Sequence, residues 1–272
     1  MAKCDRAIDQ LGSLQQELKA LRSTPNPYCY INTVDPIGGG YVFRLHPNWE
    51  TGTASRWAVI LGEIVHDLRS ALDHLVWQAV ELSGGEPDRG HAFPLLRVEP
   101  EIGFATWAAR APSPGGTRRG RLFGASPDAI TLIEAYQPYR GGQVGAVLGR
   151  LDDLWQHDKH RMTLPIVLVA EPPLLELEGC DLIRRRDRNE EGVMVVEVDV
   201  ARQVPQPKVE LRSDAPFDIG YDGRPVIDDL LGAAQIVVEM KYAFEELFPD
   251  EEDLRHGESR AAFDRLISAA AE

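Results

Sequence analysis

The chain has few cysteines and no long hydrophobic run. Its 272 residues include three cysteines, Cys4, Cys29 and Cys180, which are widely separated and form no Cys-x-x-Cys pair. This spacing excludes a disulfide framework and a thiolate zinc site, and it indicates a reducing compartment. No apolar stretch approaches the roughly 20 residues of a membrane span, and the polar beginning MAKCDRAIDQ lacks a secretion signal. We therefore expect a cytoplasmic protein that is not in a membrane.

Basic residues are the minority among the charged side chains. The chain has 29 Lys and Arg against 43 Asp and Glu, a formal net charge of −14, which disfavours nonspecific binding to nucleic acid. Any contact with RNA must therefore be local. Two clusters offer local positive charge, and we interpret both as solvated loops: Arg118, Arg119 and Arg121, and Arg184, Arg185, Arg186 and Arg188.

Several motifs of common enzymes are missing. The sequence has no Gly-x-Ser-x-Gly elbow, no Walker loop, no His-Glu-x-x-His pair and no dinucleotide-binding fingerprint. The glycines at 38–40 lie between two strand-like segments and are not followed by Gly-Lys-Ser/Thr, so we interpret them as the tip of a hairpin. Serine hydrolases, P-loop NTPases, zincins and dehydrogenases are therefore not indicated.

The periodicity of apolar residues predicts an α+β fold. Helical spacing of three and four covers residues 4–22, 53–83, 126–161 (as two helices) and 225–248, with a last helix at 258–270. A β-hairpin is expected at 28–46, and four strands form a β insertion at 165–212. We expect a single elaborated domain over residues 1–272, a helical bundle with an inserted small antiparallel sheet and an N-terminal hairpin.

The helix at 53–83 has one apolar and one polar face. At about 100° per residue, the apolar face carries Ile64, Leu68, Ala71, Leu72, Leu75 and Ala79. The opposite face carries Glu63, His66, Asp67, Ser70, His74 and Trp77. Two imidazoles on a face of this kind are unusual, because a solvated helix face holds mostly Lys, Glu and Arg. This stripe is the first candidate for a functional site.

The sequence Arg69-Ser70-Ala71-Leu72-Asp73-His74 in this helix is an Arg-x4-His pattern. It resembles the motif of the HEPN superfamily, whose members include metal-independent ribonuclease toxins and anti-phage defence proteins. The resemblance implies that Arg69 binds the scissile phosphate and that His74 acts on the 2′-hydroxyl or the leaving oxygen. It also implies RNA as substrate, with no metal and no cofactor. Imidazole titrates near neutral pH and guanidinium binds phosphate through two donors, so both roles suit the residues.

Geometry adds a condition to this hypothesis. Residues five apart on a helix diverge by about 140°, so Arg69 and His74 do not reach one phosphate from a single helix. A homodimer that brings two motif helices together meets the condition. The helix near 143–161 has its own polar end and supplies further candidates; together with the rest of the polar stripe, the supporting residues are Glu63, His66, Asp67, Ser70, Asp73, His157, His160 and Arg161.

Two other classes of function stay open. Glu63 and His66 form a Glu-x-x-His pair, which with His74 suits a metal-binding helical bundle. The other class is a noncatalytic protein-interaction module. That alternative is favoured if Arg69 is buried in a salt bridge with Glu63, Asp67 or Asp73.

Overall fold

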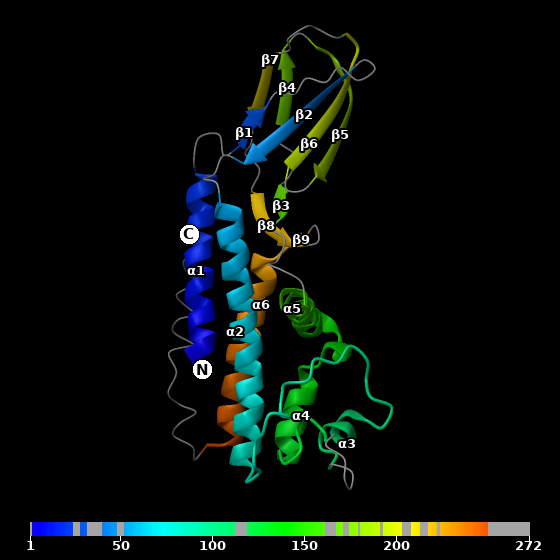
Figure 1. Cartoon of the computed structure of the whole chain (residues 1–272). Coiled ribbons are helices and arrows are strands. Elements are labelled where there is room, and N and C mark those ends of the chain that lie inside the picture. The colour runs from blue at the N-terminus through cyan, green and yellow to red at the C-terminus, as the bar shows by residue number, and fades with distance from the viewer. Residues whose placement is uncertain are drawn as a thin grey trace. The chain divides into compact units, whose positions relative to one another are not determined.

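A computed structural model shows the α+β fold expected from the sequence (Figure 1). It describes residues 2–23, 28–31, 40–47, 52–111, 119–160, 167–170, 174–178, 180–190, 193–202, 208–212, 217–221 and 224–249. Several expected features lie outside these residues, namely the turn at 32–39, the helix at 258–270, Arg118 and Arg161.

The chain falls into two compact units, each built from segments far apart in the sequence. The helical unit comprises Met1–Ser13, Val59–Leu164 and Asp228–Glu272, and the sheet unit comprises Leu14–Ala58 and Pro165–Ile227. The expectation of a single domain over 1–272 stays a prediction.

The helices expected at 4–22, 53–83, 126–161 and 225–248 lie where the apolar spacing predicted them. No helix in the described part of the chain combines the length and the apolar character needed to cross a bilayer. The observed helices are α1 (Ala2–Arg22), α2 (Thr53–Leu82), α3 (Phe104–Ala108), α4 (Pro127–Ala135), the 3-10 turn η1 (Pro138–Arg140), α5 (Gly142–His160) and α6 (Ile227–Leu247).

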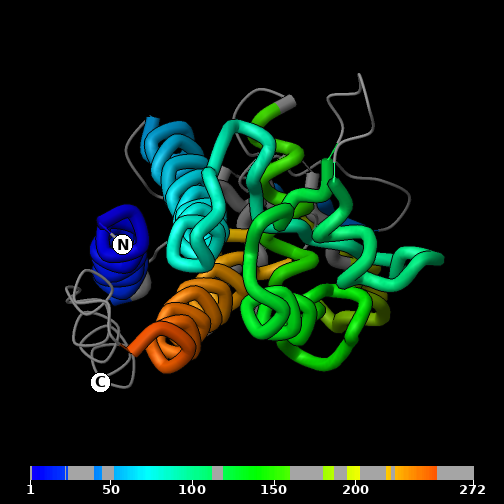
Figure 2. The backbone as a smooth tube through the Cα atoms, turned by 90° about the horizontal axis from the view of Figure 1, so that it is seen from below, coloured from blue at the N-terminus to red at the C-terminus, as the bar shows by residue number. Residues whose placement is uncertain are grey.

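The core of the helical unit is built on the apolar face of α2. All six residues predicted for that face are buried, and α6 adds Leu230, Ala234, Val237, Val238 and Phe244. Figure 2, which views the bundle from below, shows α1, α2 and α6 as neighbouring helices. Burial extends beyond the predicted face to Leu61, Val65, Val76 and Val80, so α2 is apolar around more of its circumference than a two-faced helix.

The start of α4 illustrates how local sequence sets a helix boundary. The Ser126 Oγ accepts a hydrogen bond from the Ala129 backbone N–H at 3.2 Å, and Pro127 occupies the first turn. A serine cap satisfies a donor that the helix itself leaves unpaired, and proline fits there because it has no N–H to lose. This boundary was predicted from the sequence and is confirmed.

The sheet unit contains nine strands among its described residues, all paired antiparallel. They form a four-stranded sheet in the order β1-β2-β6-β5, a three-stranded sheet β3-β8-β9 and the pair β4-β7. The strands are β1 (Tyr28–Ile31), β2 (Gly40–Pro47), β3 (Val167–Ala170), β4 (Leu174–Glu178), β5 (Leu182–Glu190), β6 (Val193–Val200), β7 (Lys208–Arg212), β8 (Phe217–Tyr221) and β9 (Arg224–Pro225).

One expectation about the strands was wrong, and one pairing was not predicted. The hairpin joins the insertion, because β2 pairs with β6 in the register Phe43↔Val196 and makes one sheet of both segments. The arginine cluster at 184–188 is not a loop but part of β5. A strand at the end of a sheet keeps one edge in water, so it tolerates charges that a central strand would exclude. Alternation of residues identifies strands, but it does not identify their partners.

Candidate functional site

The polar stripe of α2 does not remain together as one site. Two of its carboxylates are used by α1 within the helical unit. The Gln10 Nε2 donates to the Glu63 Oε2 at 2.6 Å. Asp67, whose side chain is 0% exposed, accepts hydrogen bonds from Arg6, with the Arg6 Nη2 2.6 Å from Oδ1, and from the Lys3 Nζ at 3.2 Å. These two residues therefore hold α1 against α2.

The environment of Asp67 favours its charged form. Burial alone raises the pKa of Asp67, but the hydrogen bonds and charges of Arg6 and Lys3 outweigh burial and hold the pKa below its ordinary value. A buried carboxylate with two cationic partners is the arrangement expected of a structural ion pair. Nothing in it requires a substrate.

Arg69 is also committed to the protein itself. The residue is 4% exposed. Its Nη1 donates to the Asp73 Oδ1 and its Nη2 donates to the Phe93 backbone carbonyl, both at 2.6 Å. The same Asp73 Oδ1 accepts the Phe93 backbone N–H at 2.8 Å. The pair at i and i+4 therefore binds both backbone groups of Phe93, much as a neighbouring strand would.

An aromatic ring borders the same guanidinium. The Arg69 Cζ lies 5.3 Å from the centroid of the half-buried Trp155 ring on α5, and the Lys159 Nζ lies 4.5 Å from that ring. Burial lowers the pKa of Arg69 from its ordinary value, and the charges of Asp73 and Asp152 oppose this. Burial likewise raises the pKa of Asp152, against the charge of Arg69. Arginine nevertheless stays charged in proteins, so the ion pair persists.

The remaining residues of the stripe face solvent. His66 and His74 are exposed, Ser70 is half-buried, and Trp77 is 41% exposed. The Ser70 Oγ lies 3.5 Å from the His66 Nε2. Val59, one turn before Glu63, extends this row and is 50% exposed. We call Val59, His66, Ser70, His74 and Trp77 the α2 stripe.

The two residues of the Arg-x4-His motif therefore have different surroundings. Arg69 points into the protein, where it meets Asp73, Phe93 and Trp155, while His74 lies in solvent. Within one copy of the chain they do not converge, as the helical geometry required. The condition stated for the interaction-module alternative, a buried salt bridge of Arg69 with Asp73, is met.

The expected grouping of the α5 histidines with His74 stays a prediction. Trp155 of α5 lies beside Arg69 of α2, and Asp158 of α5 lies beside Gly62 of α2, where a methyl group would be 2.6 Å from the Asp158 Oδ1. His157 is half-buried. The His160 side chain and the whole of Arg161 lie outside the described residues.

Sequence reasoning missed a tethered segment between α2 and α3. Besides Phe93, the Leu96 backbone N–H donates to the Gln137 Oε1 at 3.1 Å, and the Leu96 carbonyl accepts the Tyr139 N–H at 3.0 Å. Arg97 donates to the Gly149 carbonyl at 2.7 Å. The only signal in the sequence was the i, i+4 spacing of Arg69 and Asp73, which is equally typical of a surface pair.

A buried histidine anchors the same segment. The His91 Nδ1 accepts the Asp88 backbone N–H at 2.8 Å, so the Nε2, 2.9 Å from the Phe123 carbonyl, carries the proton. This makes His91 a neutral structural residue. Arg119, expected in a solvated loop, forms an ion pair with Asp88 and lies 3.2 Å from His91. The interpretation of Arg119 as a solvated charge was wrong, because the segment that contains Asp88 and His91 packs against its side chain.

Metal binding and nucleophilic attack by the Cys4 thiol are two further possibilities, and the described residues support neither. No three His, Cys, Asp or Glu side chains there gather closely enough to hold a metal ion, and Glu63 is bound to Gln10 instead of joining His66 and His74. Burial raises the pKa of Cys4 to about 12, so this thiol is not a nucleophile near neutral pH.

Comparison of the chain with models of known protein families, with curated protein sequences and with solved structures found no match. The function therefore has to be argued from the site itself.

Asp67→Asn should destabilise the protein in a pH-dependent way. A carboxylate whose pKa is lower in the folded than in the unfolded chain stabilises the fold above its unfolded pKa, and this contribution is lost as the pH falls through its folded pKa. We expect a cost of about 1–2 kcal/mol at neutral pH. The difference from wild type should shrink below about pH 4, as followed by urea denaturation. A constant difference from neutral to acidic pH would contradict the ion pair.

Arg69→Met should lower the free energy of unfolding by about 3 kcal/mol, because it removes the ion pair with Asp73 and leaves the Phe93 carbonyl without this donor. Arg69→Lys should restore little, since a single ammonium cannot reach both acceptors as the planar guanidinium does. The exposed His74 provides the control, and His74→Ala should change stability by less than about 0.5 kcal/mol. Equal losses of unfolding free energy in the Arg69 and His74 variants would refute the conclusion that Arg69 supports the fold and His74 does not.

Proposed function

We propose that this protein is a noncatalytic interaction module of the cytoplasm that assembles through the α2 stripe. The observation that carries the proposal is the internal use of Arg69. A phosphate-binding arginine has to offer its donors to the substrate, whereas this one donates to Asp73 and Phe93. Taking it away from these partners would leave the Phe93 carbonyl without this donor and Asp73 without its ion pair.

The composition of the α2 stripe suits a second copy of the same chain. Two of its members, Val59 and Trp77, are large apolar side chains left 50% and 41% exposed. Between them lie His66, Ser70 and His74, and the exposed carboxylate of this row, Glu63, is bonded to Gln10. In a chain of net charge −14, a stripe of this kind can meet its own copy with little repulsion.

The geometry of α2 also suits a two-fold axis. From Val59 to Trp77 the stripe follows the helix for roughly 27 Å at about 1.5 Å per residue. In a symmetric pair, a residue i of one copy contacts a residue j of the other and j contacts i, so that one patch supplies both sides of the contact. An aromatic residue at such a patch is the usual anchor of an interface.

Trp77→Asp should weaken this assembly. Wild type is expected to be a dimer at micromolar concentration in analytical ultracentrifugation, and the variant a monomer, because a carboxylate would replace the aromatic anchor in each copy. Val98, 79% exposed in the same helical unit, gives the matched control Val98→Asp, which should remain dimeric. A monomeric wild type, or dimers that survive Trp77→Asp, would refute the proposal.

The HEPN-type ribonuclease is a second candidate, and one observation favours it. His66 and His74 are both exposed on the stripe, so a dimer through α2 would bring four imidazoles to one surface. Imidazoles can serve as the acid and the base of metal-independent RNA cleavage. The phosphate ligand of this mechanism, Arg69, is however engaged in the fold.

We therefore expect purified wild type to leave RNA intact in the presence of EDTA. The assay should include several single-stranded and structured RNAs, with His74→Ala as the paired variant. Cleavage that leaves a 2′,3′-cyclic phosphate and falls about a hundredfold or more in His74→Ala would establish the ribonuclease and overturn this expectation. Cleavage equal in both proteins would point to a contaminant and leave the expectation intact.

A further inference from the structure

The β5 edge of the four-stranded sheet is a second surface with a distinctive composition. The strand is nine residues long, Leu182–Glu190, and in the described part of the chain it pairs on one side, with β6. Figure 1 shows it at the end of this sheet. A strand at the end of a sheet presents its outer backbone N–H and C=O groups to another extended chain.

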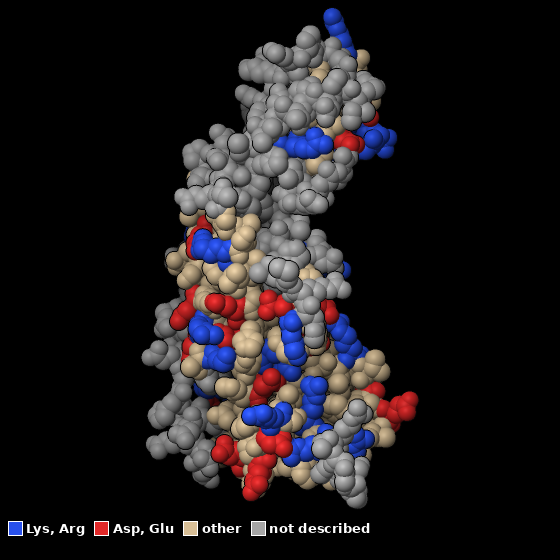
Figure 3. All heavy atoms as spheres, viewed as in Figure 1, with Lys and Arg blue, Asp and Glu red and all other residues tan. Residues whose placement is uncertain are grey.

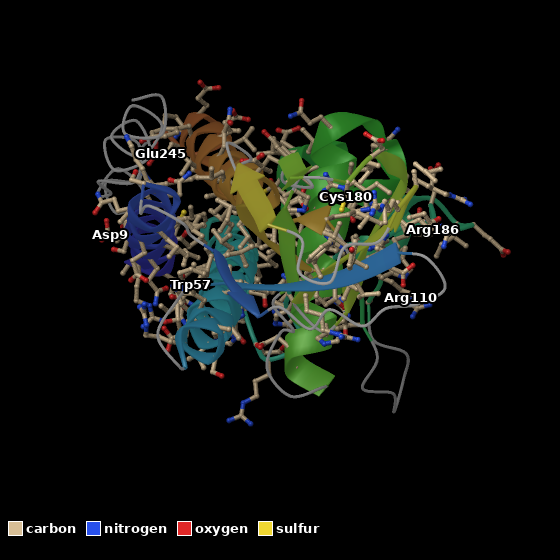
Figure 4. The ribbon with its side chains drawn as sticks, turned by 90° about the horizontal axis from the view of Figure 1, so that it is seen from above. Asp9, Trp57, Arg110, Cys180, Arg186 and Glu245 are labelled. Atoms are coloured by element: carbon tan, nitrogen blue, oxygen red, sulfur yellow. The ribbon has the colours of Figure 1, made fainter. Side chains whose placement is uncertain are left out.

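Positive charge gathers along this edge. Arg184 and Arg186 are exposed and lie two apart, so they share one face of the strand, and Arg188 follows at the same spacing. Figure 4, which labels Arg186, shows it at the rim of the sheet beside β5. In the view of Figure 3, blue atoms lie beside red ones on the described surface of the sheet.

The carboxylates nearest to this row leave room for a further partner. Arg186 lies 3.8 Å from both Glu197 and Asp199, carboxylates of the neighbouring strand β6. A distance of this size is the outer limit of an ion pair, and the Arg186 side chain is 52% exposed. An exposed pair of this type contributes little, so the guanidinium can turn to another anion at small cost.

The beginning of β5 adds an apolar feature. The pairing register shifts between Leu182 and Arg184, which makes Ile183 the extra residue of a bulge. Leu182 and Ile183 are 47% and 68% exposed. The edge therefore offers apolar surface at one end and a row of arginines after it.

We propose that the β5 edge binds an extended acidic peptide of a partner protein by adding it to the sheet as a further strand. Backbone hydrogen bonds along β5 would hold the peptide, and carboxylates at every second position would meet Arg184 and Arg186. An apolar peptide residue would cover Leu182 and Ile183. This proposal is separate from assembly through α2, because it concerns residues of the other unit.

Charge decides which extended chain is accepted. A second copy of β5 would bring arginines against arginines, and such repulsion is how natural edge strands avoid pairing with themselves. An acidic peptide replaces this repulsion with attraction. RNA would be drawn by the same charge, but Tyr41 and Phe43 of β2 are buried and give it no surface for base stacking.

Fluorescence anisotropy on the full chain tests the proposal with labelled ten-residue peptides. A peptide of alternating Glu and Thr should bind with a micromolar Kd, and one of alternating Lys and Thr about tenfold more weakly or not at all. The Glu-Thr peptide carrying backbone N-methyl groups at alternate residues should lose binding, because it cannot add to a sheet. Equal binding of the methylated peptide would reduce the site to simple charge attraction and overturn strand addition.

Paired variants locate the site. The double variant Arg184→Ser/Arg186→Ser should weaken peptide binding about tenfold or more, and both side chains are exposed, so the fold should be retained. Arg110→Ser/Arg121→Ser removes the same charge from exposed positions of the helical unit and should leave binding unchanged. Equal loss in both double variants, or tighter binding of a ten-nucleotide oligouridine than of the peptide, would overturn the proposal.

Discussion

The clamp that Arg69 and Asp73 place on Phe93 is the constraint on which the rest of the helical unit depends. It binds the N–H and the C=O of one buried residue from a single helix face. Phe93 thereby fixes where the segment after α2 crosses the bundle, and Leu96 and Arg97 continue the attachment toward η1 and α5. A buried guanidinium is tolerated only while these acceptors surround it, so fold and ion pair require each other.

This internal use of polar groups explains what α2 leaves on its surface. Its carboxylates Glu63 and Asp67 hold α1, and its arginine holds the segment at Phe93. His66, His74 and Trp77 remain outside. This row of histidines, serine and apolar residues differs from the acidic character of the chain. The row of arginines on β5 differs from it as well, because it is basic. Both proposed interaction surfaces are therefore local exceptions to the net charge.

Much of the fold could be predicted because its signals are local. The spacing of apolar residues placed α2 and α6 within a few residues, and Ser126 with Pro127 marked the start of α4. The β5 strand was missed because a run of arginines does not alternate with apolar residues. Edge position, which a sequence does not display, is what allows such a run to be a strand.

By itself, the sequence determined the fold class, the helix positions and the fact that Arg69 and His74 leave α2 in different directions, because each follows from the periodicity of a regular helix. It did not determine which of these residues would be buried. Only the tertiary structure decided that Arg69 binds Phe93 and that β2 pairs with β6. Burial and strand pairing depend on residues distant in the chain, which local patterns do not specify.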